Sequence, residues 1–360
     1  MKIWIPICCL LFGGAACSVP PAKPADPAAV PSSEMKAPMP VTIKQLPGEQ
    51  KVAVYCGDQL FTAYNYGALA EKPVLYPIVA PGGLTVTRGF PLEQRAGERV
   101  DHPHHVGYWF TYGDVNGLDF WNNSSAIPAD KKAQYGSILH RSVETAPEND
   151  GAATLSVSCD WVNADGQALL REKTTFSFRD LGNHRLIDRI TTLTANGQQV
   201  DFKDNKEGVV GLRVTRALEL PSNKAEIFTD ASGNPTAVPV LNNEGVTGNY
   251  LSSEGLTGEA VWGTRGRWMR LNGQINVKAV ALTLLDHPSN TGYPTYWHAR
   301  GYGLFAANPL GQSVFSNGKE TLNFSLAAGQ STTFRYRLVV SGETSPDAAQ
   351  IEKWRMEWEK

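Results

Sequence analysis

Residues 153–163 read ATLSVSCDWVN, and this stretch decides the fold. Apolar and polar residues alternate along it, so that one face carries Leu155, Val157, Cys159 and Trp161. A period of two residues predicts a β-strand that is buried on one face only. Four other stretches are expected to form strands, because they alternate or are rich in β-branched and aliphatic residues: 170–179, 185–195, 209–220 and 277–285.

The C-terminal part continues the β pattern and then changes to a helical one. Residues 321–326 (TLNFSL) and 332–340 (TTFRYRLVV) flank residues 327–330 (AAGQ), which predicts a β-hairpin. A helix is expected over 345–360, where Thr344 or Ser345 can cap the first turn. Its apolar stripe, expected to pack on the core, consists of Ile351, Trp354 and Trp358.

Strands without alternating helices predict a mainly β protein of antiparallel sheets, either a barrel or, as we expect, a large β-sandwich. We expect one domain over 41–360, including the C-terminal helix.

The whole chain of 360 residues has a net charge of -2, which argues against nucleic acid as a partner. Cys56 and Cys159 are expected either to pair or to remain as two buried thiols.

The N-terminus carries the features of an export signal. A positive start and an apolar run over residues 3–12 are followed by small residues just before Cys17. We therefore expect residues 1–16 to be a lipoprotein signal peptide and Cys17 to be lipidated, with ordinary cleavage and a free Cys17 as the alternative. The Pro/Ala-rich stretch 17–40 is expected to be a tether. Together these features predict a protein of the cell envelope that reaches the membrane through a lipid anchor only.

Histidines gather in two short segments. Residues 101–105 read DHPHH, and Asp-His-Pro recurs at 286–288, shortly before WHARGY at 297–302. Imidazole and carboxylate groups both exchange protons near neutral pH, and both bind metals. Residues of alternate parity face opposite ways in a strand, so His298 and Arg300 share a face that suits an anionic or hydroxyl-rich substrate. The two segments are expected to line one pocket.

A metal site is the alternative use of these histidines. His102 and His104 form a His-x-His pair, a common ligand motif. A metal needs at least one more ligand, and the candidates are Asp101, Glu207, His287 and His298. The chain also lacks the zinc, nucleotide and phosphate-binding motifs that would imply a known cofactor. We therefore expect no metal and no cofactor.

These motifs together resemble one bacterial family. The DHPHH segment is followed by GDVNG-x-DFW at 113–121, and KEG stands at 206–208. With the segments 286–288 and 297–303, this combination resembles the envelope proteins labelled "PmoA" or "methane oxygenase", and the match runs from Lys72 to the last hairpin. No stretch after the signal is long enough to span a bilayer, which excludes the membrane subunit of methane monooxygenase that shares this label.

The resemblance implies a fold similar to the sandwiches of the galactose mutarotase group, and an enzyme that acts on a carbohydrate or sugar derivative. The implied chemistry is acid–base, namely epimerisation, elimination or hydrolysis, with His104 or His105 and Glu207 as the acid and base. The alternatives are a non-catalytic glycan-binding lipoprotein and a His-ligated metal enzyme. The residues expected to bind the substrate, with the tryptophans stacking on a sugar ring, are Asp101, His102, Trp109, His287, Trp297, His298, Arg300 and Tyr302.

Overall fold

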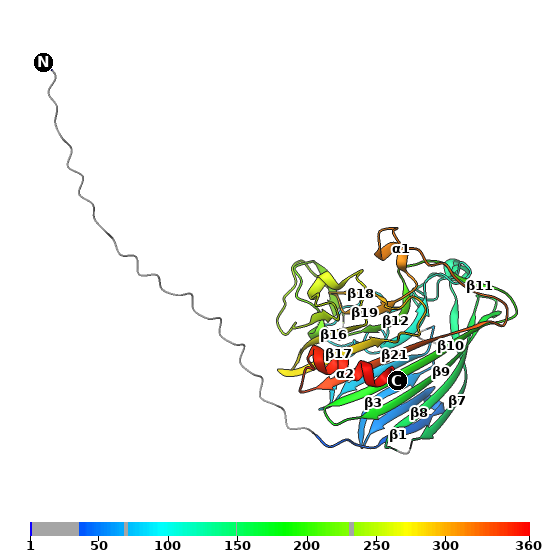
Figure 1. The fold of residues 1–360 in the computed structure, drawn as a ribbon, viewed down its shortest axis with the longest axis horizontal. Helices are drawn as coiled ribbons and strands as arrows, with labels where there is room; N and C mark the ends of the chain where they lie inside the picture. The colour runs from blue at the N-terminus through cyan, green and yellow to red at the C-terminus, as the bar shows by residue number, and fades with distance from the viewer. Residues whose placement is uncertain (2–35, 68–70, 149, 230–233) are drawn as a thin grey trace. The chain divides into compact units, whose positions relative to one another are not determined.

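The computed structural model describes residues 1, 36–67, 71–148, 150–229 and 234–360 (Figure 1). Residues 35–360 form one compact unit. Residues 2–35 lie outside the described residues. They include the predicted signal peptide apart from Met1, the predicted lipidation site Cys17 and most of the predicted tether. No helix in the described part of the chain is long and apolar enough to cross a membrane.

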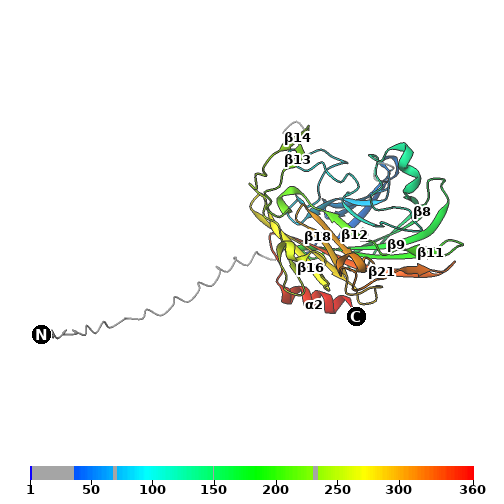
Figure 2. The ribbon, with the colours of Figure 1, turned by 90° about the horizontal axis from the view of Figure 1, so that it is seen from above.

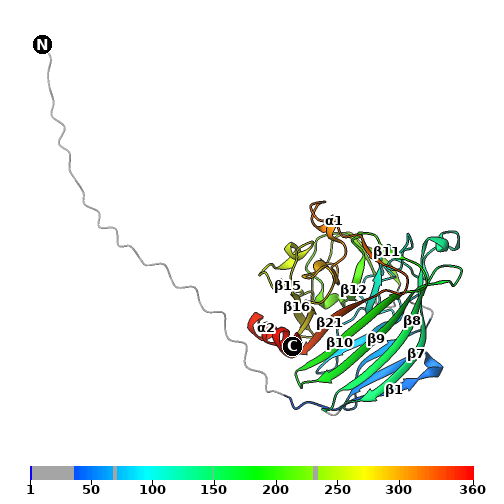
Figure 3. The same cartoon turned by 45° about the vertical axis from the view of Figure 1, so that its right-hand side comes forward.

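Two large antiparallel sheets contain most of the strands in the described part of the chain (Figures 1 and 3). The nine-stranded sheet has, in spatial order, β1 (Val41–Leu46), β2 (Lys51–Cys56), β3 (Gln59–Asn65), β4 (Val74–Ala80), β6 (Tyr108–Tyr112), β12 (Gly208–Arg213), β19 (Leu304–Asn308) and β18 (Tyr296–Arg300), with β5 (Leu84–Thr85) paired to β4. The eight-stranded sheet has β15 (Asn249–Ser252), β16 (Trp268–Ile275), β17 (Lys278–Asp286), β21 (Ser331–Gly342), β10 (His184–Ala195), β9 (Ala168–Asp180), β8 (Ala153–Val162) and β7 (Ser137–Pro147).

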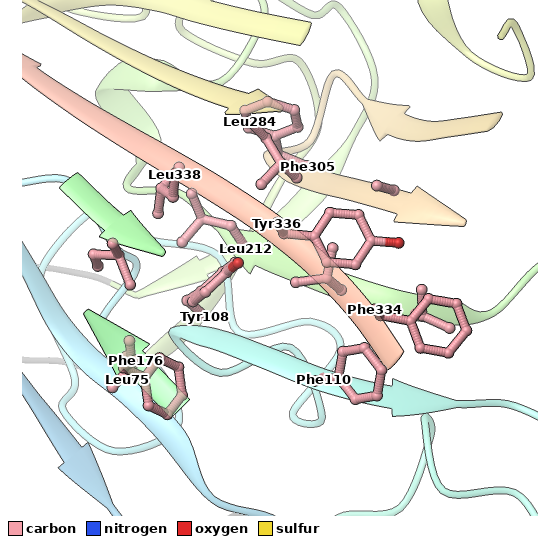
Figure 4. Packing of buried hydrophobic residues seen from close by; sticks show 14 of the residues in the cluster. Leu75, Tyr108, Phe110, Phe176, Leu212, Leu284, Phe305, Phe334, Tyr336 and Leu338 are labelled. Atoms are coloured by element: carbon pink, nitrogen blue, oxygen red, sulfur yellow. The ribbon is translucent and has the colours of Figure 1, made fainter. Parts of the chain in front are cut away.

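The main core lies between these two sheets, which confirms the predicted sandwich. Strand β8 alternates between buried and half-buried residues, as its sequence predicted. Its buried side chains join a single cluster to which both sheets contribute. Figure 4 shows part of this cluster, with Phe110, Leu212 and Phe305 from one sheet near Phe176, Phe334 and Leu338 from the other.

The predicted C-terminal helix is α2 (Ala348–Trp358), which lies beside the eight-stranded sheet (Figure 2). It begins three residues later than expected, and Asp347 is its N-cap, because the Asp347 carboxylate accepts a hydrogen bond from the Gln350 N–H. Ile351 and Trp354 pack on Trp268 and Leu285, on the face of the sheet away from the main core. The expected apolar stripe therefore makes a second, smaller core.

Two predicted strand features differ from the structure. The strand expected over 209–220 ends at Arg213 and is followed by a 3-10 turn, η4 (Arg216–Leu218). The expected C-terminal hairpin has its turn, but its two arms do not pair. Strand β20 (Phe324–Leu326) pairs with β11 (Val200–Phe202), whereas β21 is a central strand of the large sheet. The arms separate because β21 finds longer partners on both of its edges.

The remaining elements are short and lie in the connections. They are the strands β13 (Glu226–Thr229) and β14 (Pro235–Val238), the 3-10 turns η1 (Pro47–Glu49), η3 (Ala129–Gln134) and η5 (Gly258–Val261), and the helix α1 (Gln312–Phe315).

Residues 36–40, the last part of the predicted tether, run along the domain. The Lys36 amide donates to the Asn183 side chain, the Met39 amide donates to the Asp180 carboxylate, and the Lys36 ammonium pairs with Glu343. A Cβ at position 182 would lie 1.9 Å from the Lys36 carbonyl oxygen, so only glycine leaves room for this segment. These five residues, the docked segment below, belong to the folded unit.

The centre of the nine-stranded sheet is buried on both faces. Strands β6, β12 and β19 contain only buried residues. One face of these strands joins the main core, and the other is covered by a second cluster that contains Trp109, Trp121 and Leu304. The candidate site lies on this second face.

Candidate functional site

The register of the four neighbouring strands β6, β12, β19 and β18 places the site residues in rows across the sheet. Trp109 is opposite Gly211, Gly211 is opposite Ala306, and Ala306 is opposite His298. In the next row, Leu304 lies between Arg213 and Arg300. A Cβ at position 211 would lie 2.5 Å from the Trp109 ring, so this glycine makes room for the indole.

The His-rich segment 101–105 lies over these rows and is held by the buried guanidinium of Arg88. Arg88 Nη1 donates to the carbonyl and the carboxylate of Asp101, at 2.8 and 2.7 Å. Arg88 Nη2 donates to the carbonyls of His102 and His105, at 3.0 and 3.1 Å. His102 has a φ of 43°, which is rare for a residue that precedes proline. The four contacts of Arg88 therefore stabilise an otherwise unfavourable turn.

A cavity of about 390 Å³ opens between this segment and strand β18. Its walls bring together most of the residues that the sequence nominated. They are His102, His104, His105, Glu207, His298, Arg300 and Tyr302, joined by Asn122, Lys206 and Trp262. Residues of segments 101–105 and 298–302 therefore line one cavity, whereas residues 286–288, which were expected there too, do not.

His105 forms the buried floor of the cavity, and its tautomer follows from its neighbour. Arg213 Nη1 lies 3.1 Å from His105 Nδ1. A guanidinium only donates, so Nδ1 accepts and the proton of the neutral ring is on Nε2. Burial, and then the positive charges nearby, hold the pKa of His105 well below its usual value. His105 is thus a neutral hydrogen-bond donor, and its expected role as an acid or base stays a prediction.

His298 carries the opposite tautomer. Its Nδ1 lies 3.1 Å from the Lys206 carbonyl oxygen, which only accepts, so the proton is on Nδ1 and Nε2 keeps its lone pair. Burial lowers the pKa of His298 to about 3, with Lys206 and Arg300 acting in the same direction. His298 is therefore a neutral acceptor. Its Nδ1 is also 3.8 Å from Glu207, too far for a hydrogen bond.

Glu207 is the one carboxylate among the described residues that line the cavity. Its side chain is 15% exposed, and Lys206 Nζ lies 2.9 Å from Oε1. The backbone is held where Gly113 N donates to the Glu207 carbonyl at 2.7 Å. A Cβ at position 113 would lie 2.7 Å from the Glu207 Cβ, so glycine is needed there. Glu207 therefore presents the carboxylate of this lining to the cavity.

A buried lysine stands behind the imidazoles. Lys72 is 3% exposed, and its Nζ donates to the Trp121 carbonyl at 3.3 Å. Burial lowers the pKa of Lys72 to about 7. Burial also lowers the pKa of His104 to about 2, and the Lys72 charge acts in the same direction. His104 is therefore neutral, like His105 and His298.

Arg300 lies in the wall of the cavity between two aromatic rings. Its guanidinium carbon lies 5.3 Å from the Trp262 ring and 5.9 Å from the Tyr302 ring. Tyr302 in turn stacks on His102, with ring centres 5.1 Å apart. Trp262 is 36% exposed and is the one tryptophan among the described residues that line the cavity.

Four nominated residues lie away from the cavity surface. Trp109 and Trp297 are fully buried, beneath His105 and in the main core, so neither has a face for a sugar ring. His287 contacts Ser289 and the Trp358 ring beside α2, in a turn outside the cavity. Asp101 lies beneath the cavity, where it pairs with Arg88 and Arg213.

Sequence reasoning missed several residues of the site. Arg213 and Arg88 were detectable, because a charged residue inside an apolar strand pattern must find a buried partner. Trp262 and Asn122 lie in loops without a pattern that would single them out.

Among the described residues, no group of three or more His, Cys, Asp or Glu side chains could hold a metal ion. Cys56 and Cys159 are both buried, free thiols.

Known proteins place the chain in one family. Comparison with curated proteins gives no match. Among solved structures, the chain is similar to a GH36 α-galactosidase from Geobacillus stearothermophilus (8% identity, TM-score 0.40), covering 84% of this chain and 41% of that one. It is also similar to a putative aldose 1-epimerase from Escherichia coli K12 (10% identity, TM-score 0.36), covering 84% of this chain and 99% of that one. The chain thus spans about two fifths of the galactosidase, and similarity at this level says nothing about function. Residues 51–355 match a family of unknown function (DUF6807), and the chain belongs to that family.

Proposed function

We propose that the protein is an enzyme that acts on a carbohydrate or sugar derivative by acid–base chemistry. The observation that carries this proposal is the cavity itself, in which Glu207, Arg300 and several imidazoles meet. Hydroxyl-rich molecules need donors and acceptors at short spacing. His105 offers an N–H, His298 offers a lone pair, and Trp262 offers a ring face for the C–H surface of a sugar.

In the proposed mechanism, Glu207 takes a proton from a substrate carbon next to a carbonyl group, and the electron pair of the broken C–H bond moves onto the carbonyl oxygen. The neighbouring cations and the N–H of His105 stabilise the negative charge that this step leaves on a substrate oxygen. Since His104, His105 and His298 are neutral, none of them is a strong proton donor at neutral pH. The proposed reaction is therefore epimerisation, in which the proton returns to the same carbon from water, whereas elimination and hydrolysis both need an acid for the leaving group.

The proposed location is the cell envelope. Support comes from the sequence alone, through the signal-like residues 1–16, the cysteine at position 17 and the Pro/Ala-rich stretch that follows. Labelling with a palmitate analogue tests this. Label on the wild type that is lost in Cys17→Ser supports the anchor, and an unlabelled protein contradicts it.

The proposed chemistry is tested with Glu207→Gln, which keeps the size of the side chain and removes the base. Purified protein is incubated with a panel of sugars and sugar acids, and proton exchange into the sugar C–H positions is followed by NMR in D₂O. We expect the variant to lose ~100-fold or more in exchange rate and to retain binding. Glu254→Gln, an exposed glutamate outside the cavity, is the matched control and keeps full activity.

Two results would contradict this mechanism. Full activity in Glu207→Gln removes Glu207 as the base. Binding of a glycan without exchange or turnover in the wild type supports the alternative, a non-catalytic glycan-binding lipoprotein.

A further inference from the structure

Two buried arginines lie next to the cavity, outside its lining. Arg88 and Arg213 are almost fully buried. Among the described residues, Asp101 is the one carboxylate within ion-pairing distance of either, at 2.7 Å from Arg88 and 2.6 Å from Arg213. Two guanidinium groups therefore share one carboxylate. The buried carboxylates of Glu98 and Glu219 also act on Arg88 and on Arg213, respectively, and neither arginine lines the cavity, so an anionic ligand has Arg300 as its partner.

Arg300, in the wall of the cavity, carries a positive charge that has no carboxylate partner among the described residues. Among the described residues its guanidinium contacts only the rings of Trp262 and Tyr302, and it has neither a carboxylate partner nor a hydrogen bond. Lys206, the other cation that lines the cavity, is already paired with Glu207. The five N–H groups of Arg300 are thus free to bind a ligand.

Arg213 and Arg300 lie near the same aromatic ring, that of Tyr302. The strand register puts Arg213 and Arg300 on either side of Leu304. Both guanidinium carbons lie near the Tyr302 ring, at 4.9 Å for Arg213 and 5.9 Å for Arg300. The positive field is therefore concentrated near Tyr302, on the side of Arg300, whose planar group matches a carboxylate with two parallel hydrogen bonds.

We propose that the ligand of this cavity is a sugar acid, whose carboxylate binds Arg300 while its hydroxyl groups contact the imidazoles. This inference rests on the proposed carbohydrate function and adds the charge of the substrate. Asn122 and Trp262 complete the lining on the uncharged part of the ligand.

The test compares ligands that differ only in charge. Binding of D-galacturonate and D-glucuronate to the wild-type protein is measured by calorimetry, beside their methyl esters and the neutral sugars D-galactose and D-glucose. We expect at least one acid to bind at least ~10-fold more tightly than its own ester, with affinity falling as salt is added.

Arg300→Met tests the role of the arginine, because methionine keeps much of the side-chain length without the charge. We expect it to weaken binding of the acid by ~10-fold or more and to leave ester binding unchanged. Arg337→Met is the matched control, since Arg337 also stacks on a tryptophan, 5.2 Å from the Trp358 ring, but lies outside the cavity.

The outcomes separate this inference from the proposed function. Acids and esters that bind equally, or acid binding that is unaffected by Arg300→Met, overturn the sugar-acid inference and leave a carbohydrate enzyme standing. A protein that binds none of the six probes overturns both.

Discussion

Arg213 Nη1 lies 3.1 Å from His105 Nδ1, and this contact decides where the proton of the buried imidazole is. Nitrogen NMR of the wild-type protein should therefore show His105 as a neutral ring protonated on Nε2 throughout pH 5–8. The reason is that its pKa is held far below its usual value by burial and by neighbouring cations. A His105 ring that titrates within this range, or carries its proton on Nδ1, contradicts the assignment.

Removing the Arg213 side chain should also lower the free energy of unfolding. Arg213→Met leaves the Asp101 carboxylate paired with Arg88, so it removes two hydrogen bonds without leaving a buried charge unpaired, and it should destabilise the fold by about 1–3 kcal/mol. Urea unfolding measures this change. Exposed Arg141, which pairs with Asp160 at the surface, is the control, and its replacement by methionine should cost less than about 1 kcal/mol.

The two later histidines should behave differently on mutation, although they follow similar sequence patterns. His298→Ala removes an acceptor from the cavity and should weaken ligand binding by about 10-fold. His287→Ala lies beside α2 and should leave binding unchanged. Calorimetry with the best ligand of the panel compares the two. Equal losses in both variants would show that residues 286–288 reach the site.

Lys72 should make stability rise with pH above neutrality. Burial lowers its pKa to about 7 from 10.5, so between these values the unfolded chain binds a proton that the folded chain releases. Stability linked to Lys72 then increases by up to about 1.4 kcal/mol per pH unit, most clearly from pH 7 to 9. Urea unfolding of Lys72→Met should lack this increment, whereas Lys44→Met, an exposed lysine on β1, should keep it. Identical pH slopes in wild type and Lys72→Met would show that Lys72 stays charged.

The docked segment should contribute to stability. A chain that begins at Val41 loses the contacts of Lys36 and Met39 and uncovers the surface at Gly182. We expect its Tm to be about 2–4 °C below that of a chain beginning at Lys36, which corresponds to roughly 1 kcal/mol. Calorimetric scans of the two proteins give the comparison. Equal Tm values would mean that residues 36–40 act only as part of the tether.

The sandwich was predictable because several of its strands have an alternating pattern of apolar and polar residues in the sequence. Strand β8 alternates since one of its faces meets the core, and the stripe of α2 repeats at helical spacing for the same reason. The central strands of the nine-stranded sheet lack such an alternating pattern. All five residues of β6 are buried, so the sequence could not tell that Trp109 covers the floor of the site while Phe110 belongs to the main core.

The site was predictable where chemistry was concentrated in the sequence. Segments 101–105 and 297–302 stood out because reactive residues gather in them, and the cavity joins them. The second Asp-His-Pro misled because the same three residues also make a turn, in which Asp286 accepts from Asn290 and from the Thr295 amide. The roles of the histidines could not be predicted, since the position of each proton depends on a partner far away in the chain.

Arg88 binds the His-rich segment through three carbonyl groups and only one side chain. The shape of this loop therefore depends mainly on backbone contacts, and Arg88 makes no hydrogen bond to the imidazole rings. Position 102, at positive φ, admits few residues, and asparagine is the best substitute for histidine there. Position 104 has no such restriction, so a redesign that seeks new chemistry in this family should vary position 104 first and leave Arg88 untouched.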